Sequence, residues 1–279
     1  MTCGVDATHR GKSFKRGKFM RTAIAALLLV PGAALAASAF DGTWKMRPDS
    51  AKTTGKANEF QVVDGMYACS SCVPEIRVKA DGTDQKVEGH PYYDTISVTV
   101  ASPSAIRIVE KKHGKRVFAV NYEVSTDGKT LTGKFEDYTG TQVATGTVTE
   151  TRRTDASAGS HPVSGSWQPE QLSDANDAAR LYVYQMTEDH FSMHWNGQSY
   201  NAMFDGKQYP VQGDPAKTMV SVKKVNERTV DETDSRDGKV TDEIRLAAGS
   251  DGTTIKVTDN DVLHHQITTF TLDKQQTHE

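Results

Sequence analysis

Apolar and polar residues alternate with a period of two over most of the chain after residue 40. Residues 95–100 read Thr-Ile-Ser-Val-Thr-Val, and residues 190–195 place His190, Ser192 and His194 on one face and apolar side chains on the other. This period is typical of half-buried strands. Asp-Gly and Asn-Gly pairs separate the stretches at hairpin spacings. The pattern predicts an all-β chain of antiparallel strands; residues 172–180 are the longest helix candidate, and they are short enough to form a loop instead.

Two parts of the chain resemble one another. With an offset of 124, residues 81–131 align without a gap to residues 205–255, and the Asp-Gly turns coincide. Upstream, with the offset changed by one, Trp44 aligns with Trp167. Such a register indicates an internal duplication. The small, polar segment around Ser157 is typical of a linker. We therefore expect two domains, residues 37–156 and residues 157–279, with roughly eight or nine strands each.

A meander of this many strands removes its exposed edges most completely by closing into a barrel, although an open sandwich would also satisfy the pattern. Gly42-Thr43-Trp44 and Gly165-Ser166-Trp167 open the two repeats and resemble the Gly-x-Trp signature of lipocalin-like barrels. The duplicated arrangement is similar to uncharacterised exported bacterial proteins described as lipocalin-like. The resemblance implies two tandem barrels, each closed at one end by its tryptophan beneath a basic residue. Candidates for that residue are Arg152 or Arg153 in the first repeat and Lys274 in the second.

The N-terminus carries the pattern of a secretory signal. Six basic residues precede the apolar run from Ala23 to Ala36, which ends in small residues. We expect residues 1–36 to be a signal peptide, with Met20 as an alternative start of translation, and the product to be periplasmic or secreted. An uncleaved interfacial helix is the alternative, which Pro31-Gly32 disfavours. No later apolar run is long enough to span a membrane.

The net charge limits the classes of partner, and the cysteines predict a disulfide. The signal segment holds six of the 33 basic and one of the 36 acidic residues, so its removal changes the net charge from −3 to −8. This balance argues against nucleic acid and anionic membranes as partners. Only Cys69 and Cys72 then remain, in a C-x-x-C spacing with no helix pattern after it. We expect a structural disulfide, with a redox-active pair or half of a metal site as alternatives.

No arrangement typical of catalysis is present. The chain has no G-x-S-x-G elbow, H-E-x-x-H helix or phosphate-binding glycine loop, so we expect no enzyme and no cofactor. His190 and His194 share a strand face and could meet His264 or His265, but we expect no metal site. The acid-rich residues 230–237 divide their carboxylates between two faces and are expected to form a solvated edge strand.

The expected function is binding. A barrel mouth is a concave site walled by alternate side chains, and the second repeat is rich in suitable ones. We expect a small apolar ligand there, beside Tyr182, Tyr184, Phe191, Met193, Trp195 and Tyr200. The alternative is a structural or envelope protein with filled barrels, whose outer faces bind an unknown protein. An apolar cavity of at least about 300 Å³ would favour the first reading.

Overall fold

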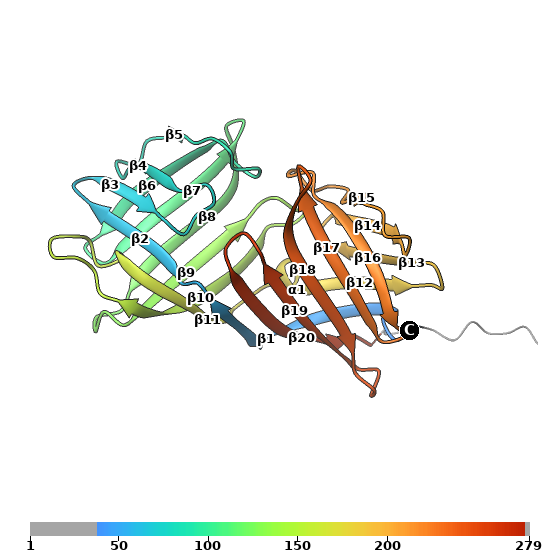
Figure 1. Cartoon of the computed structure of the whole chain (residues 1–279). Helices are drawn as coiled ribbons and strands as arrows, with labels where there is room; N and C mark the ends of the chain where they lie inside the picture. Colours follow the sequence, from blue (N-terminus) through green and yellow to red (C-terminus); the bar gives the residue numbers. More distant parts are fainter. Residues whose placement is uncertain (1–37, 277–279) are drawn as a thin grey trace, which may run out of the picture. The chain divides into compact units, whose positions relative to one another are not determined.

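The computed structural model describes residues 38–276, which are almost entirely β-structure (Figure 1). Twenty strands form two ten-stranded antiparallel sheets. Each sheet curls into a nearly closed barrel, so the predicted all-β class and the prediction of two barrels are confirmed. The helix candidate forms only one helical turn, α1 (Asp177–Arg180). The Asn176 side chain caps its N-terminus by accepting a hydrogen bond from the Ala179 amide. The predicted signal segment lies outside the described residues.

The first barrel contains β2 to β11, in the sheet order β4-β3-β2-β11-β10-β9-β8-β7-β6-β5. Its strands are β2 (Asn58–Val63), β3 (Met66–Cys69), β4 (Ile76–Lys79), β5 (Gln85–Lys86), β6 (Thr95–Ser102), β7 (Ala105–Lys112), β8 (Lys115–Val124), β9 (Thr130–Asp137), β10 (Ala144–Thr154) and β11 (Gly165–Ser173).

The second barrel contains β1 and β12 to β20, in the order β14-β13-β12-β1-β20-β19-β18-β17-β16-β15. Its strands are β1 (Gly42–Gly55), β12 (Leu181–Met186), β13 (His190–Trp195), β14 (Gln198–Met203), β15 (Tyr209–Pro210), β16 (Met219–Asn226), β17 (Thr229–Arg236), β18 (Lys239–Ala248), β19 (Thr254–Asp261) and β20 (Gln266–Lys274). Position by position, this order repeats that of the first barrel.

The two repeats exchange their opening strands, which the sequence did not indicate. Strand β1 comes from the first repeat but lies between β12 and β20, where Trp44 is opposite Tyr182 on one side and Lys274 on the other. Strand β11 comes from the second repeat but lies between β2 and β10. Figure 1 shows the blue β1 beside the red β20. The expectation that residues 37–156 and 157–279 each close their own barrel is therefore corrected, because each barrel takes one strand from the other repeat.

Both barrels close through a short seam near the two ends of the sheet. In the second barrel, Ser199 on β14 and Gln212, two residues after β15, exchange two backbone hydrogen bonds of 3.0 and 2.7 Å. In the first barrel, Asp81 bridges to Thr99 on β6, and the Gly82 amide donates to the Val98 carbonyl at 2.8 Å. Each seam is thus held by far fewer bonds than the ladders elsewhere in the sheet.

The two signature tryptophans are fully buried in equivalent positions. The Trp44 indole nitrogen donates to the Phe40 carbonyl at 2.7 Å, and Trp167 donates to Val163 at 2.8 Å. Lys274 Nζ lies 5.3 Å from the centre of the Trp44 ring, and the Arg152 guanidinium lies 3.9 Å from that of Trp167. A basic residue covers each tryptophan, as expected. Because of the strand exchange, however, Arg152 of the first repeat covers Trp167 of the second, and Lys274 of the second repeat covers Trp44 of the first.

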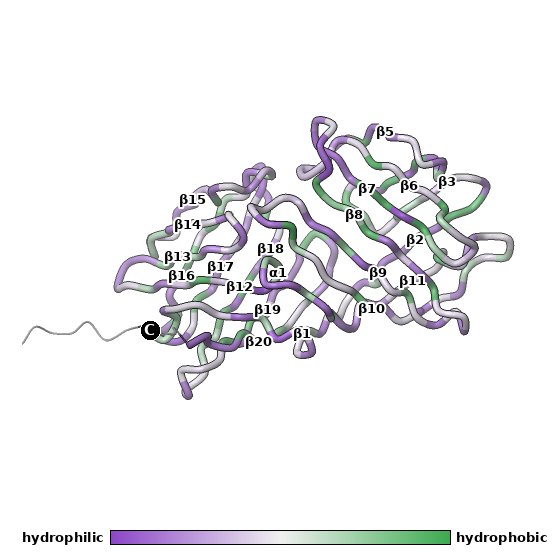
Figure 2. The backbone as a smooth tube through the Cα atoms, turned by 180° about the vertical axis from the view of Figure 1, so that it is seen from behind, coloured by the Kyte–Doolittle hydropathy of each residue, from purple (hydrophilic) through white to green (hydrophobic). Residues whose placement is uncertain are grey.

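Each barrel has its own apolar core, and hydrophobic stretches along the strands give way to hydrophilic hairpin ends (Figure 2). In the first barrel, Val62, Val124 and Leu131 pack around Trp167. In the second barrel, Leu246, Ile255 and Leu272 belong to the cluster of Trp44. The inner faces of both barrels are therefore where buried functional groups must be sought.

Candidate functional site

The six predicted ligand residues come together on the inner side of β12, β13 and β14. Their rings stack on one another, with centroid separations of 6.1 Å for Tyr182 and Tyr184, 6.2 Å for Tyr182 and Trp195, and 5.5 Å for Tyr184 and Phe191. Phe191 is fully buried and Tyr200 is 3% exposed, while Met193 packs against the core. The side chains thus fill much of this part of the second barrel. Their contact with a ligand stays a prediction.

A group of carboxyl groups, which the sequence analysis missed, lies in the same barrel. In the sheet register Asp234 on β17 is opposite Asp242 on β18, which is opposite Asp261 on β19. Glu232 lies two residues before Asp234 and is 7% exposed. Asp259 lies two residues before Asp261 on β19. The available signal was the alternation Val230-Glu232-Asp234, which places acids in positions that continue an apolar strand face.

The prediction of a solvated edge strand for residues 230–237 is therefore wrong. Strand β17 lies between β16 and β18, so it has a neighbour on both sides. The carboxylates do divide between two faces. Asp231 points outward and pairs with the Arg245 Nε at 2.7 Å, whereas Glu232 accepts a 2.5 Å hydrogen bond from the buried Tyr200 hydroxyl. The alternation of polar and apolar residues predicted correctly that the carboxylates divide between two faces. The position of the strand within the sheet, however, depends on pairing with strands far away in the chain.

Burial raises the pKa values of these inward-pointing carboxyl groups. It raises the pKa of Glu232 to about 7, and burial together with neighbouring carboxylates raises the pKa of Asp234 to about 9 and of Asp259 to about 7. Buried polar atoms without a hydrogen-bond partner include Asp234 Oδ1, Asp259 Oδ1, Thr241 Oγ1 and the Trp195 indole nitrogen. The inside of the second barrel is consequently polar toward this end, which suits an apolar ligand poorly. Within residues 38–276, no group of three His, Cys, Asp or Glu side chains could hold a metal ion.

The first barrel holds a partly open cavity of about 190 Å³. Its wall contains aromatic and aliphatic side chains, namely Phe60, Phe118, Tyr67, Tyr122, Ile76, Ile96, Ile108 and Val120. Asn58, Ser71 and Glu110 add polar groups, as does His264 of the turn between β19 and β20. The Phe60 ring lies 6.2 Å from Tyr67 and 5.5 Å from Tyr122, centre to centre. The aromatic residues of the second repeat made it the predicted ligand site, but whether rings fill a barrel or line a space is decided by packing.

Two carboxyl groups give the first barrel a polar side. Glu110 on β7 borders the cavity, and burial, with a smaller effect of Asp137, raises its pKa to about 7. Glu150 is 2% exposed; burial raises its pKa to about 7, although the Asn58 side chain donates to it at 2.8 Å. Glu150 is thus satisfied within the protein, whereas Glu110 faces the cavity.

The Cys69–Cys72 pair is at bonding distance, with an S–S separation of 2.05 Å, so the predicted disulfide geometry is confirmed. Cys69 is 1% exposed at the end of β3, and both cysteines border the cavity. No helix follows the pair, since Ile76–Lys79 forms β4. The disulfide therefore fixes the chain at the cavity rim.

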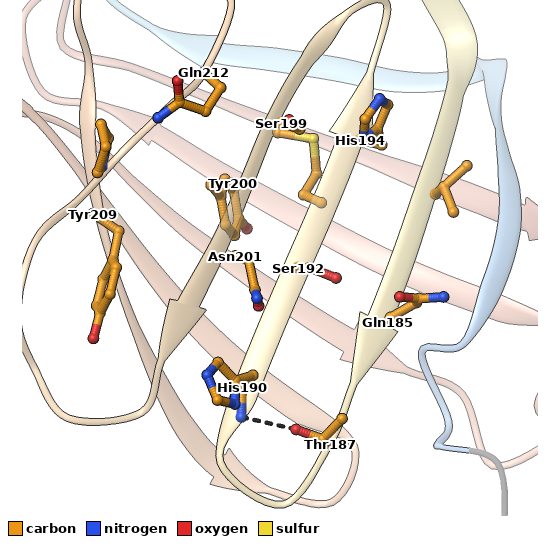
Figure 3. Close-up of a pocket in the computed structure, with 13 residues that line it drawn as sticks. Gln185, Thr187, His190, Ser192, His194, Ser199, Tyr200, Asn201, Tyr209 and Gln212 are labelled. Atoms are coloured by element: carbon orange, nitrogen blue, oxygen red, sulfur yellow. Dashed lines mark hydrogen bonds between the residues drawn. The ribbon is translucent and has the colours of Figure 1, made fainter.

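A second hollow, of about 830 Å³, lies on the outer face of the second barrel (Figure 3). Most of its lining comes from outward-facing side chains of β12, β13 and β14, with Tyr209, Pro210 and Gln212 beside the seam. Met193 and Tyr200, two of the predicted ligand residues, also border it, although both belong to the core side of their strands. His190 and His194 lie near opposite ends of β13 on this face, as the alternation predicted. They therefore do not point into the barrel.

Comparison of the chain with protein-family models, with curated proteins and with solved structures finds no match. The fold and the two hollows thus define the chain as a duplicated, strand-exchanged β-barrel protein. No helix in the described part of the chain is long and apolar enough to cross a membrane.

Proposed function

We propose that this chain is an exported, non-enzymatic binding protein of the lipocalin-like class that holds a small, largely apolar molecule inside its first barrel. The observation that carries this proposal is the 190 Å³ cavity with aromatic walls and one inward carboxyl group. A concave, mostly apolar space with few convergent polar groups is the usual form of a small-molecule site.

The cavity volume limits the size of the ligand. At 190 Å³ the cavity is below the volume of about 300 Å³ named above as favouring a ligand, at which sites for drug-sized molecules start, so it is too small for them. An apolar cavity of about 150 Å³ is enough to bind benzene. A molecule of one ring, with few additional atoms, therefore fits the space best.

Glu110 suggests which polar group the ligand carries. Its carboxyl group borders the cavity, and no hydrogen bond or ion pair within the described residues contributes to its raised pKa. A buried carboxyl group gains most from a partner that can donate a hydrogen bond. A one-ring molecule with a hydroxyl or N–H group satisfies both the apolar wall and this side chain.

Three ring-sized probes test the proposal: phenol, indole and cyclohexanol, titrated into the mature chain by calorimetry. Val120→Phe adds a ring to the cavity wall, and we expect it to abolish binding. Glu110→Gln keeps the size of the side chain and is expected to weaken binding by about three- to tenfold above pH 7, where the wild-type carboxylate accepts more strongly. Glu123→Gln, on the exposed side of β8, is the matched control and should bind like the wild type.

If none of the probes binds, or if Val120→Phe binds as well as the wild type, the cavity proposal fails. The alternative of filled barrels with an outer interaction face would then be favoured.

Export is part of the proposal. The Cys69–Cys72 disulfide supports it, because such bonds persist in oxidising compartments. N-terminal sequencing of the exported protein should find that it begins between Ala37 and Phe40. An intact apolar run at residues 23–36 would contradict export through a cleaved signal.

A further inference from the structure

The outer hollow on β12, β13 and β14 differs from both barrel interiors in its chemistry. Its lining contains no Asp, Glu, Lys or Arg side chain. Apolar surface comes from Val183, Met193, Tyr200, Tyr209 and Pro210. Amide, hydroxyl and imidazole groups lie among it, on Gln185, Asn201, Gln212, Thr187, Ser192, Ser199, His190 and His194. A ligand that carries a formal charge finds no fixed opposite charge in this lining.

Three of the polar side chains form a straight row across the strands. In the sheet register Gln185 on β12 is opposite Ser192 on β13, and Ser192 is opposite Asn201 on β14. Side chains in opposite positions are about 5 Å apart, so the row of amide, hydroxyl and amide covers about 10 Å. Each amide both donates and accepts hydrogen bonds. The row thus offers alternating donors and acceptors over the length of a disaccharide.

The three side chains of the row are free to bind, whereas His190 and Thr187 already bond to the Asp189 carboxylate at 2.8 and 3.0 Å. Figure 3 draws one hydrogen bond between the lining residues, from the His190 amide to Thr187 Oγ1 at 3.0 Å, and the row itself takes no part in it. Gln185 and Asn201 are both exposed. Their hydrogen-bonding capacity is therefore directed to the hollow and to solvent.

Tyr209 supplies a flat surface at the other side of the hollow (Figure 3). Its hydroxyl donates to Asp205 Oδ2 at 3.1 Å, which restrains the ring. An amphipathic ring of this kind presents an apolar face next to polar groups. The C–H face of a sugar ring has the same mixed character, with hydroxyl groups around its edge.

We propose that this hollow binds an uncharged carbohydrate, with the Gln185–Ser192–Asn201 row bonded to ring hydroxyls and Tyr209 packed against a sugar face. The uncharged lining disfavours acidic or basic polymers. Strand β14 is the end strand of the sheet and pairs across the seam only at Ser199, so an extended peptide added to this edge is the alternative occupant that the test distinguishes. This site does not depend on the cavity of the first barrel.

The test uses the full mature chain and four uncharged trisaccharides, namely maltotriose, cellotriose, chitotriose and mannotriose, measured by calorimetry. We expect at least one to bind. Gln185→Ala and Asn201→Ala should each weaken that binding by up to about tenfold, the effect of one well-placed hydrogen bond. Gln61→Ala removes an exposed amide from β2 of the first barrel and should change nothing. Val120→Phe should also bind normally, which separates this site from the barrel cavity.

Three results would overturn the proposal. The first is that no trisaccharide binds at millimolar concentration. The second is that binding occurs but is equally strong in Gln185→Ala, Asn201→Ala and the wild type. The third is that a pool of uncharged hexapeptides binds in a manner that depends on Asn201 while the trisaccharides do not, which would identify the hollow as a peptide site.

Discussion

Strand exchange predicts that each signature tryptophan stabilises the barrel built mainly from the other repeat. We therefore expect Trp44→Ala to loosen the second barrel, although Trp44 belongs to the first repeat. Trp167→Ala should loosen the first barrel. Each variant is the matched control for the other, since the two tryptophans are equally buried and make equivalent hydrogen bonds.

The expected magnitude follows from the burial of Trp44. Replacing a buried tryptophan by alanine costs about 3–5 kcal/mol, through lost transfer free energy and the space left behind. The substitution also removes the donor to the Phe40 carbonyl and the ring beneath Lys274. Because the whole free energy of unfolding of a domain is about 5–15 kcal/mol, the affected barrel loses a large part of its stability.

Hydrogen exchange followed by mass spectrometry locates the effect. Residues 219–261 cover β16 to β19 of the second barrel, and residues 95–137 cover β6 to β9 of the first. In Trp44→Ala, amides of residues 219–261 should exchange about two to four powers of ten faster, while residues 95–137 stay close to the wild type. Trp167→Ala should show the reverse. If Trp44→Ala instead accelerates residues 95–137 alone, the strand exchange is refuted.

Three further predictions concern pH, domain boundaries and the disulfide. The folded-state pKa of Glu232 is raised, so the stability that its neutral form contributes is complete below pH 4.5 and is lost as the pH rises through about 7. Urea unfolding of Glu232→Gln should therefore show a free energy of unfolding higher than that of the wild type by on the order of 1–3 kcal/mol at pH 8, and this gain should disappear at pH 4. The control is Asp231→Asn: the wild-type Asp231 carboxylate points outward and has a lowered pKa, so this variant should be less stable than the wild type at pH 8. The fragment 157–279 lacks β1 and leaves β11 without β2 and β10, so circular dichroism should show no cooperative unfolding; a sharp transition would contradict this and show that β11 can replace β1 between β12 and β20. Cys69 and Cys72 should react with a thiol reagent only after reduction, and Cys72→Ser should remain folded, because the second repeat has no such pair; labelling of the untreated protein would contradict this.

The sequence by itself determined the local features of this protein. Alternation with a period of two placed His190 and His194 on the outer face of β13 and Phe191 on the inner face. Paired turn residues and the matching registers around Trp44 and Trp167 indicated antiparallel strands and two similar barrels. These features depend on the preferences of neighbouring residues, and those preferences are written in the chain itself.

Only the tertiary structure decided which strands lie side by side. An opening strand with a buried tryptophan fits either barrel equally well by pattern, so the sequence could not show that β1 pairs with β12 and β20. The same holds for the acids of β17, which are buried because β16 and β18 flank that strand. It holds as well for the cavity beside Glu110, because the volume left inside a barrel depends on side chains brought together from strands far apart in the chain.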